Sequence, residues 1–179
     1  MRRAALASLL ALGGLLACAE KGTRVEQLEG ANPGAFRRVA VVPFSDSRGQ
    51  GWLMAAKVNQ GLSGLGFNTV DLHQVETVFS SLKLDFSSAL SIHSLAEIRH
   101  ATLAEALIFG SVDSSWREAT LLMIETEMGD MVLSAKLKPR RGPAFRTPEE
   151  VAAEALRAIS LASGAAPRRG GASSLPEPQ

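Results

Sequence analysis

One run of apolar and β-branched residues, Arg37–Phe44 (RRVAVVPF), constrains the fold more than any other feature of this sequence. A run of this kind is typical of a strand buried on both faces of a parallel sheet. Small and polar residues at 45–51 predict a loop, and 52–65 shows helical spacing of apolar residues before a stop at Gly66. A second strand is predicted at 67–72. Strand, helix and strand in this order predict a right-handed βαβ unit with parallel strands.

Two further helices are predicted after this unit. Residues 73–82 look helical, residues 85–92 have the composition of a loop, and residues 94–97 (SLAE) form a capping-box pattern ahead of a short helix at 95–102. The buried face of the first helix, at 52–65, is expected to carry Leu53, Ala56, Gln60 or Gly61, and Leu65, with Val58 and Leu62 beside it.

Three strand candidates follow, at 106–115, 119–126 and 131–138, and Gly129 lies in the turn between the last two. A glycine in such a turn is typical of a β-hairpin. We therefore predict a single α/β domain: a mixed sheet of about five strands with helices packed against it, opening with the parallel βαβ unit. The length of 179 residues and a hydrophobic fraction of 46% suffice for one packed core.

The clearest helix start in the sequence is Thr147-Pro148-Glu149-Glu150. Thr147 is the expected N-cap, Pro148 occupies the first helical position, and Glu150 completes a capping box. The helix is predicted to end near Ser163. Its buried stripe is expected at Val151, Ala155, Leu156 and Ile159.

The first 17 residues have the pattern of a signal peptide. Arg2 and Arg3 precede thirteen uncharged residues, 4–16, which are too few to span a bilayer but match the apolar region of a signal peptide. The sequence Leu15-Leu16-Ala17-Cys18 resembles the lipobox of bacterial lipoproteins. Cys18, the only cysteine, is then the lipid attachment site and carries palmitate or similar acyl chains at the mature N-terminus. The alternative is an ordinary signal peptide with an incidental cysteine.

We divide the rest of the chain into a lipidated N-terminus and flexible tether at 18–36, the α/β domain at 37–163 and a disordered tail at 164–179. The tether and tail are rich in small, polar and proline residues. By resemblance to lipoprotein sorting, Ala19 in place of aspartate favours the periplasmic face of the outer membrane. Without residues 1–17 the chain carries seventeen basic and eighteen acidic side chains, a net charge of −1. This balance argues against a nucleic-acid partner.

Several motifs of enzymes or cofactor sites are incomplete here. Gly49 and Gly51 precede a helix, but Met54 stands where a dinucleotide fingerprint needs its third glycine. No serine lies in a hydrolase elbow, which leaves the alternative of a cell-wall hydrolase without support. The isolated histidines His73, His93 and His100 predict no metal site, and Met123, Met128 and Met131 are expected to fill the core. We therefore expect a protein that is not an enzyme and holds no cofactor.

The densest basic run is Lys136, Lys138, Arg140 and Arg141. Lysines at a strand end block edge-to-edge aggregation, and this explanation competes with binding of an anionic partner such as peptidoglycan or a lipid headgroup. Trp116 lies at an element boundary, as Trp52 does, and such a tryptophan belongs either to an interface or to the core. Candidate partner-binding residues are Trp116, Lys138, Arg140 and Arg141.

Four segments resemble a group of bacterial lipoprotein domains. Arg38–Phe44 (RVAVVPF) resembles the opening strand of the group, RVAVLPF, and Ala104–Val112 (AEALIFGSV) resembles its strand GADALIFGSV. Residues 62–71 resemble its L…GF passage, and residues 128–130 resemble its TGE turn. The group includes the curli secretion channels, the activator lipoproteins of penicillin-binding proteins and the N-terminal domain of TolB. Leu103 departs from the pattern, since the group commonly has glycine there.

The resemblance implies a non-enzymatic periplasmic lipoprotein, anchored to the outer membrane, that acts as an adaptor or assembly factor with an envelope protein partner. Activation of a peptidoglycan synthase is the alternative, and peptidoglycan binding or homo-oligomerisation stays open. A pore is not expected, because a membrane-spanning hairpin needs about 20 residues plus turns and every loop here is shorter.

Replacing Cys18 by alanine is expected to abolish acylation and release the protein from the membrane fraction, because no other thiol can carry the acyl chain. Incorporation of labelled fatty acid, followed by fractionation, measures this. Fatty acid still incorporated into Cys18→Ala would contradict the lipoprotein assignment.

Overall fold

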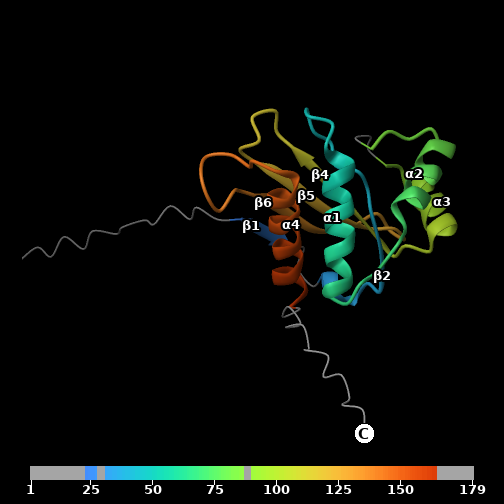
Figure 1. Ribbon diagram of the computed structural model, residues 1–179. Coiled ribbons are helices and arrows are strands. Elements are labelled where there is room, and N and C mark those ends of the chain that lie inside the picture. Colours follow the sequence, from blue (N-terminus) through green and yellow to red (C-terminus); the bar gives the residue numbers. More distant parts are fainter. Residues whose placement is uncertain (1–22, 28–30, 87–89, 165–179) are drawn as a thin grey trace, which may run out of the picture.

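The computed structural model describes residues 23–27, 31–86 and 90–164 as one α/β domain with a six-stranded mixed sheet (Figure 1). The sheet order is β1-β6-β5-β4-β2-β3. In chain order the elements are β1 (Arg24–Gln27), a 3-10 turn η1 (Pro33–Ala35), β2 (Arg38–Val41), α1 (Gly51–Gly64), β3 (Asn68–Thr69), α2 (Leu72–Ser81), α3 (Ile92–Thr102), β4 (Ala106–Val112), β5 (Ala119–Glu125), β6 (Met131–Leu137) and α4 (Pro148–Ser163). The predicted fold class is confirmed.

The opening βαβ unit is present as predicted. Strand β2 pairs in parallel with β3 on one side and with β4 on the other, and α1 connects β2 to β3. The strand β3 has only two residues, fewer than the predicted 67–72. The reason is local, because the Asp71 carboxylate accepts from the backbone N–H groups of His73 and Gln74 and starts α2 at once.

The other half of the sheet is antiparallel. The strands β4, β5 and β6 form the predicted meander, with the positive φ of Gly129 in the β5–β6 turn. A sixth strand was not predicted: β1 lies within the segment assigned to the tether and pairs with β6 from Arg24↔Lys136 to Gln27↔Leu133. Residues 24–27 therefore belong to the folded domain. A strand of four residues with one partly buried side chain, Val25, gives no periodic signal.

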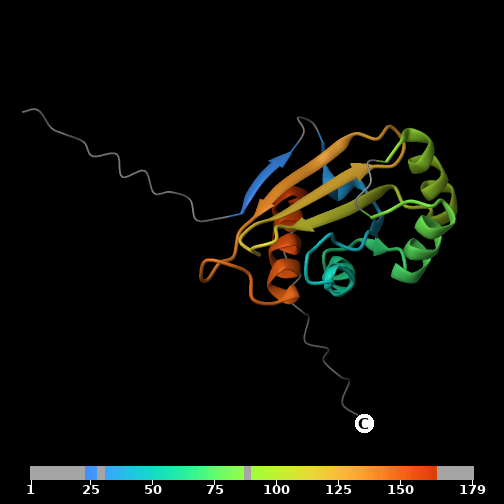
Figure 2. The same cartoon turned by 90° about the horizontal axis from the view of Figure 1, so that it is seen from above.

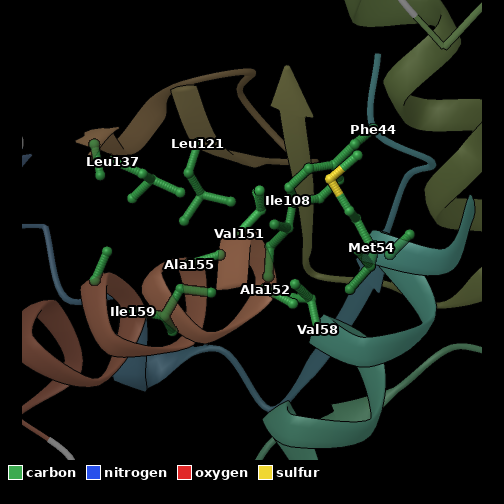
Figure 3. Close-up of a cluster of buried hydrophobic side chains, with 14 of the residues drawn as sticks. Phe44, Met54, Val58, Ile108, Leu121, Leu137, Val151, Ala152, Ala155 and Ile159 are labelled. Carbon is green, nitrogen blue, oxygen red and sulfur yellow. The ribbon is translucent and has the colours of Figure 1, made fainter. Parts of the chain in front are cut away.

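Helices cover the two faces of the sheet unequally. The helices α1 and α4 lie side by side across one face, and α2 and α3 gather at the β2–β4 end of the other (Figures 1 and 2). The larger core lies under α1 and α4 and includes Ile108, Leu121, Val58 and Val151 (Figure 3). The smaller core lies under α2 and α3. It consists of Ala40, Val42, Val70, Val75, Phe79, Leu95, Ile98, Ala104 and Leu107.

The buried face of α1 differs from the predicted one. Leu53 is exposed, and the core side carries Gly51, Met54, Ala55, Val58 and Leu62. Apolar residues occur all around this helix, so spacing alone did not decide its orientation. Contact with α4 decides it, since a Cβ at Gly61 would lie 2.2 Å from Leu156 Cδ1.

The helix α3 begins three residues before the predicted Leu95. Its N-cap is Ser91, whose hydroxyl accepts from the backbone N–H of Ser94, so Ser94 is inside the helix rather than its cap. At the other end Leu103 adopts φ 58°, the left-handed conformation that favours glycine. Leucine in place of the glycine of the resembling group thus leaves the turn intact, with Leu103 in a conformation that disfavours a side chain.

The helix α4 begins at Pro148, with Thr147 as N-cap, as predicted. The Thr147 hydroxyl accepts from the backbone N–H of Glu150 at 3.4 Å, and the Glu150 carboxylate accepts from the N–H of Arg146 at 2.8 Å. The backbone N–H of Glu149 and the Thr147 hydroxyl lower the pKa of the Glu149 carboxyl. Val151, Ala155 and Ile159 are buried as expected, and Leu156 is partly buried.

Replacing Thr147 by alanine is expected to lower the free energy of unfolding by about 0.5–2 kcal/mol, because the first turn of α4 loses its cap. Chemical denaturation measures the change. Thr77→Ala is the control, since the exposed Thr77 donates its hydroxyl hydrogen bond to the His73 carbonyl within α2 and caps no helix. An unchanged midpoint for Thr147→Ala would show that the cap does not stabilise the domain.

Candidate functional site

Of the candidate partner-binding residues, Trp116 is buried, whereas Lys138, Arg140 and Arg141 are exposed. Trp116 is fully buried in the larger core, so its side chain offers no surface to a partner and the interface assignment is wrong. The Arg48 guanidinium lies 4.1 Å from the Trp116 ring centroid and covers it. Trp116 sits in the β4–β5 turn with φ 57°. Asp113 holds this turn: hydrogen bonds from the backbone N–H of Glu118 and from the Ser115 hydroxyl lower the pKa of Asp113.

The glycine loop after β2 has a structural explanation. Gly51 opens α1 so close to the segment after β2 that a Cβ there would lie 1.7 Å from the carbonyl oxygen of Phe44. Met54 is fully buried beneath the helix. The Asp46 carboxylate accepts from the backbone N–H groups of Arg48 and Gln50 and so closes the loop on itself. The close packing of α1 against Phe44 is therefore sufficient to explain why residue 51 is glycine.

The basic residues gather at one edge of the domain. We call Lys138, Arg140, Arg141, Arg146 and Arg157 the basic edge. Four of them lie in the loop from β6 to α4, and Arg157 lies in α4. Because β1 runs antiparallel to β6, with Arg24 opposite Lys136, this loop lies beside the start of β1 (Figures 1 and 2). The basic edge and the point where the chain enters the sheet are therefore neighbours.

One buried carboxylate connects these parts. The side chain of Glu154 is 7% exposed and lies 2.8 Å from Arg140 Nε and 3.5 Å from an Arg157 guanidinium nitrogen. It also accepts a hydrogen bond of 2.9 Å from the hydroxyl of Thr23, the residue before β1. Glu154 thus ties the entering chain to α4 and to the β6–α4 loop. The spacing of apolar residues along α4 did not predict that Glu154 is buried, because a glutamate on a helix usually faces solvent.

A groove of about 380 Å³ opens between the β6–α4 loop and α4. Arg140, Arg141 and Arg157 line it together with Glu150 and Glu154, and Phe145 and Ala153 add apolar surface. Within the described residues, Lys138 and Arg141 form no ion pair, whereas Arg140 and Arg157 share Glu154. Two exposed cations at this edge are therefore available to an external anion.

A second candidate surface lies on the sheet itself. Over β5, β6 and β1, the face opposite α1 and α4 carries no helix among the described residues. We call this the open face. The strand registers arrange it in three rows across the sheet, which are Thr120-Lys136-Arg24, Leu122-Ser134-Glu26 and Ile124-Met131. On β4 these rows continue to Ser111, Phe109 and Leu107, of which Leu107 is buried in the smaller core.

The third row ends in an exposed apolar group at the β5–β6 turn. Ile92, Met128 and Met131, which we call the hairpin patch, are 59%, 65% and 49% exposed. A Cβ at Gly129 would lie 3.5 Å from Ile92 Cδ1, so the turn sits against the start of α3. The expectation that these methionines fill the core holds for buried Met123 and is wrong for the other two.

A one-residue bulge explains why Met131 faces outward. From Leu137 back to Leu133, every second residue of β6 faces the larger core, and strict alternation would continue this to Met131. The register shifts between Met123↔Leu133 and Ile124↔Met131, which leaves Val132 as an extra residue. The shift moves Met131 to the open face beside Ile124.

The described residues hold no group of three or more His, Cys, Asp or Glu side chains placed to bind a metal. The three histidines lie exposed on α2 and α3, with His73 near Trp52 at a ring distance of 5.5 Å. Among the helices that the structure describes, none is long and apolar enough to cross a membrane. Cys18, residues 1–17 and the tail beyond Gly164 lie outside the described residues.

The fold is similar to those of several solved structures. A dodecamer of PelC from Paraburkholderia phytofirmans matches with a TM-score of 0.51 and 19% identity, over 77% of this chain and 96% of that chain. Lipoprotein GNA1162 from Neisseria meningitidis matches with a TM-score of 0.49 and 18% identity, over 62% and 84% of the two chains. LpoB from Escherichia coli matches with a TM-score of 0.49 and 17% identity, over 61% of this chain and 59% of that chain. No protein-family model and no curated protein matches the sequence.

Replacing Glu154 by alanine is expected to loosen β1, because Arg140, Arg157 and Thr23 lose their shared acceptor. Hydrogen bonds to charged groups contribute about 1.5–3 kcal/mol, and solvent at the half-exposed arginines reduces this to roughly 1–2 kcal/mol of unfolding free energy. Amide hydrogen exchange should speed up at Val25–Gln27. Glu127→Ala, which breaks an exposed pair with Arg99, should change neither quantity measurably. Equal effects of the two variants would contradict a special role for Glu154.

Proposed function

We propose that this protein is a non-enzymatic lipoprotein of the outer membrane, anchored through acyl chains on Cys18, that acts as an adaptor or assembly factor on the periplasmic side. The open face, with the hairpin patch at its end, is the surface offered to the envelope protein partner. The observation that carries the proposal is the exposure of Ile92, Met128 and Met131 next to a sheet face that no helix of the described part of the chain covers. Exposed apolar groups of this kind mark interaction sites, and methionine adapts to irregular partners.

The position of β1 leaves only a short segment of chain between Cys18 and the domain. Only residues 19–22 separate Cys18 from Thr23, the first residue tied to the domain. A fully extended chain of this length reaches about 17 Å. The sequence alone suggested a tether of eighteen residues, 19–36, with a mean span of roughly 24 Å. The domain of an acylated chain therefore stays close to its membrane.

Activation of a penicillin-binding protein is the alternative. The resemblance to activator lipoproteins supports it. An activator of an inner-membrane synthase must cross the peptidoglycan layer from the outer membrane, for which a long linker is expected. The short segment before Thr23 therefore ranks this alternative below a role next to the outer membrane.

Photocrosslinking in intact cells tests the proposal. A photoreactive residue at Met131 or Lys136, both exposed on the open face, is expected to give adducts with an outer-membrane or secretion component. The matched control is Leu161, an exposed apolar residue of α4 away from the sheet, which should not give these adducts.

The other outcomes are informative. Adducts mainly with a penicillin-binding protein would favour synthase activation, and adducts between two copies would favour homo-oligomerisation through the open face. The same adducts from Leu161 as from Met131, or none from the open face, would contradict the assignment of this surface to a partner.

A further inference from the structure

The basic edge concentrates positive charge in a chain that is otherwise balanced. The loop sequence Lys138–Arg146 (KPRRGPAFR) contains four cations and no carboxylate. The mature chain as a whole carries a net charge of −1, with seventeen basic and eighteen acidic side chains. Attraction of an anionic surface by this protein must therefore come from local charge, since net charge gives none.

The same edge is where the anchored end of the chain enters the domain. The antiparallel pairing of Arg24 with Lys136 places Thr23 level with the end of β6. The hydrogen bond from Thr23 to Glu154 fixes it there, next to the two arginines that Glu154 holds. The basic edge thus lies next to Thr23, where the chain that leads to Cys18 leaves the domain.

We infer that the basic edge binds anionic lipid headgroups of the membrane that holds the acyl chains, and so fixes the orientation of the domain. The inference rests on the proposed acylation of Cys18. A segment of residues 19–22, with a reach of about 17 Å, holds the edge within a few Debye lengths of the bilayer at physiological salt. The attraction of cations to an anionic leaflet falls off within about one Debye length, and this segment is short enough to let the basic edge come into contact with the leaflet.

The roles of the cations differ. Arg140 and Arg157 are bound to Glu154 and give the edge its shape. Lys138 and Arg141 are exposed and, within the described residues, have no acidic partner, so they can meet phosphate groups directly. Each such cation near an anionic surface raises binding by about fivefold.

The orientation has a consequence for the open face. The hairpin patch lies at the opposite end of β6 from Lys138, and the seven residues of this strand span about 20–24 Å. With the basic edge on the lipid, Met128 and Met131 face away from the membrane, toward the periplasm. The two surfaces are therefore used together without competing for space.

Vesicle binding tests the inference without acyl chains. Residues 18–179 with Cys18→Ser retain every described residue, and co-sedimentation measures their binding to phosphatidylethanolamine vesicles with or without phosphatidylglycerol. Binding is expected only to vesicles that contain phosphatidylglycerol, and it should fall steeply with added salt. Because this chain carries no acyl group, the result is independent of whether Cys18 is acylated in cells.

Two matched double variants locate the surface. Lys138→Gln with Arg141→Gln is expected to weaken binding about 25-fold, as two factors of about fivefold. Arg37→Gln with Lys83→Gln removes the same charge from the β2–α2 side of the domain and should leave binding within about twofold. Unfolding midpoints of both variants should equal that of the parent chain, because all four side chains are exposed or partly exposed.

Three results would overturn the inference. One is equal binding to vesicles with and without phosphatidylglycerol, including no binding to either. Another is an equal loss in the two double variants, which would reflect net charge alone. The third is binding to isolated peptidoglycan sacculi but not to vesicles, which would assign the basic edge to the cell wall.

Discussion

The structure depends on hydrophobic packing against both faces of β4. This strand pairs in parallel with β2 and antiparallel with β5, so it joins the two halves of the sheet. Ile108 on one face belongs to the core under α1 and α4, and Leu107 on the other belongs to the core under α2 and α3. Because α2 and α3 are short, the second core reaches β5 only at Ile124 and does not extend over β6 and β1. The open face is the direct result of this unequal coverage.

Close backbone approaches complete the larger core. A Cβ at Gly110 would lie 2.2 Å from the Phe44 ring, and one at Gly61 would lie equally close to Leu156. The first contact lets Phe44 cover the middle of β4, and the second lets α1 and α4 lie side by side. At both positions a larger residue would force the contacting elements apart and loosen the packing of the core.

Local signals in the sequence were sufficient for the parts of the fold in which they are strong. The run before Phe44, the hairpin at Gly129 and the cap at Thr147 each predicted an element that the structure contains. The parts that were missed are set by tertiary contacts. The strand β1 exists because β6 offers it an edge, and the bulge at Val132 reverses the side on which Met131 lies. No pattern within a few residues records either effect.

The candidate surfaces were predicted unevenly for the same reason. The basic run was visible because its residues are adjacent in the chain. The structure adds Arg146 from the same loop and Arg157 from α4, which lies beside the loop. Glu154 and the hairpin patch were not visible. A buried glutamate looks like any helical glutamate, and exposed methionines look like core residues. Only folding places the acceptor between two arginines and the methionines at the end of an open sheet.

The pairing of β1 with β6 also determines how the domain carries mechanical load. Under the proposed anchoring at Cys18 and binding of a partner at the β5–β6 turn, tension between the two would act along the strand axis, because these points lie at opposite ends of β6. Antiparallel hydrogen bonds run perpendicular to the strands, so such tension shears them all together instead of opening them one by one. The short edge strand thus acts as a shear clasp, with the Thr23–Glu154 bond at the end that receives the force first.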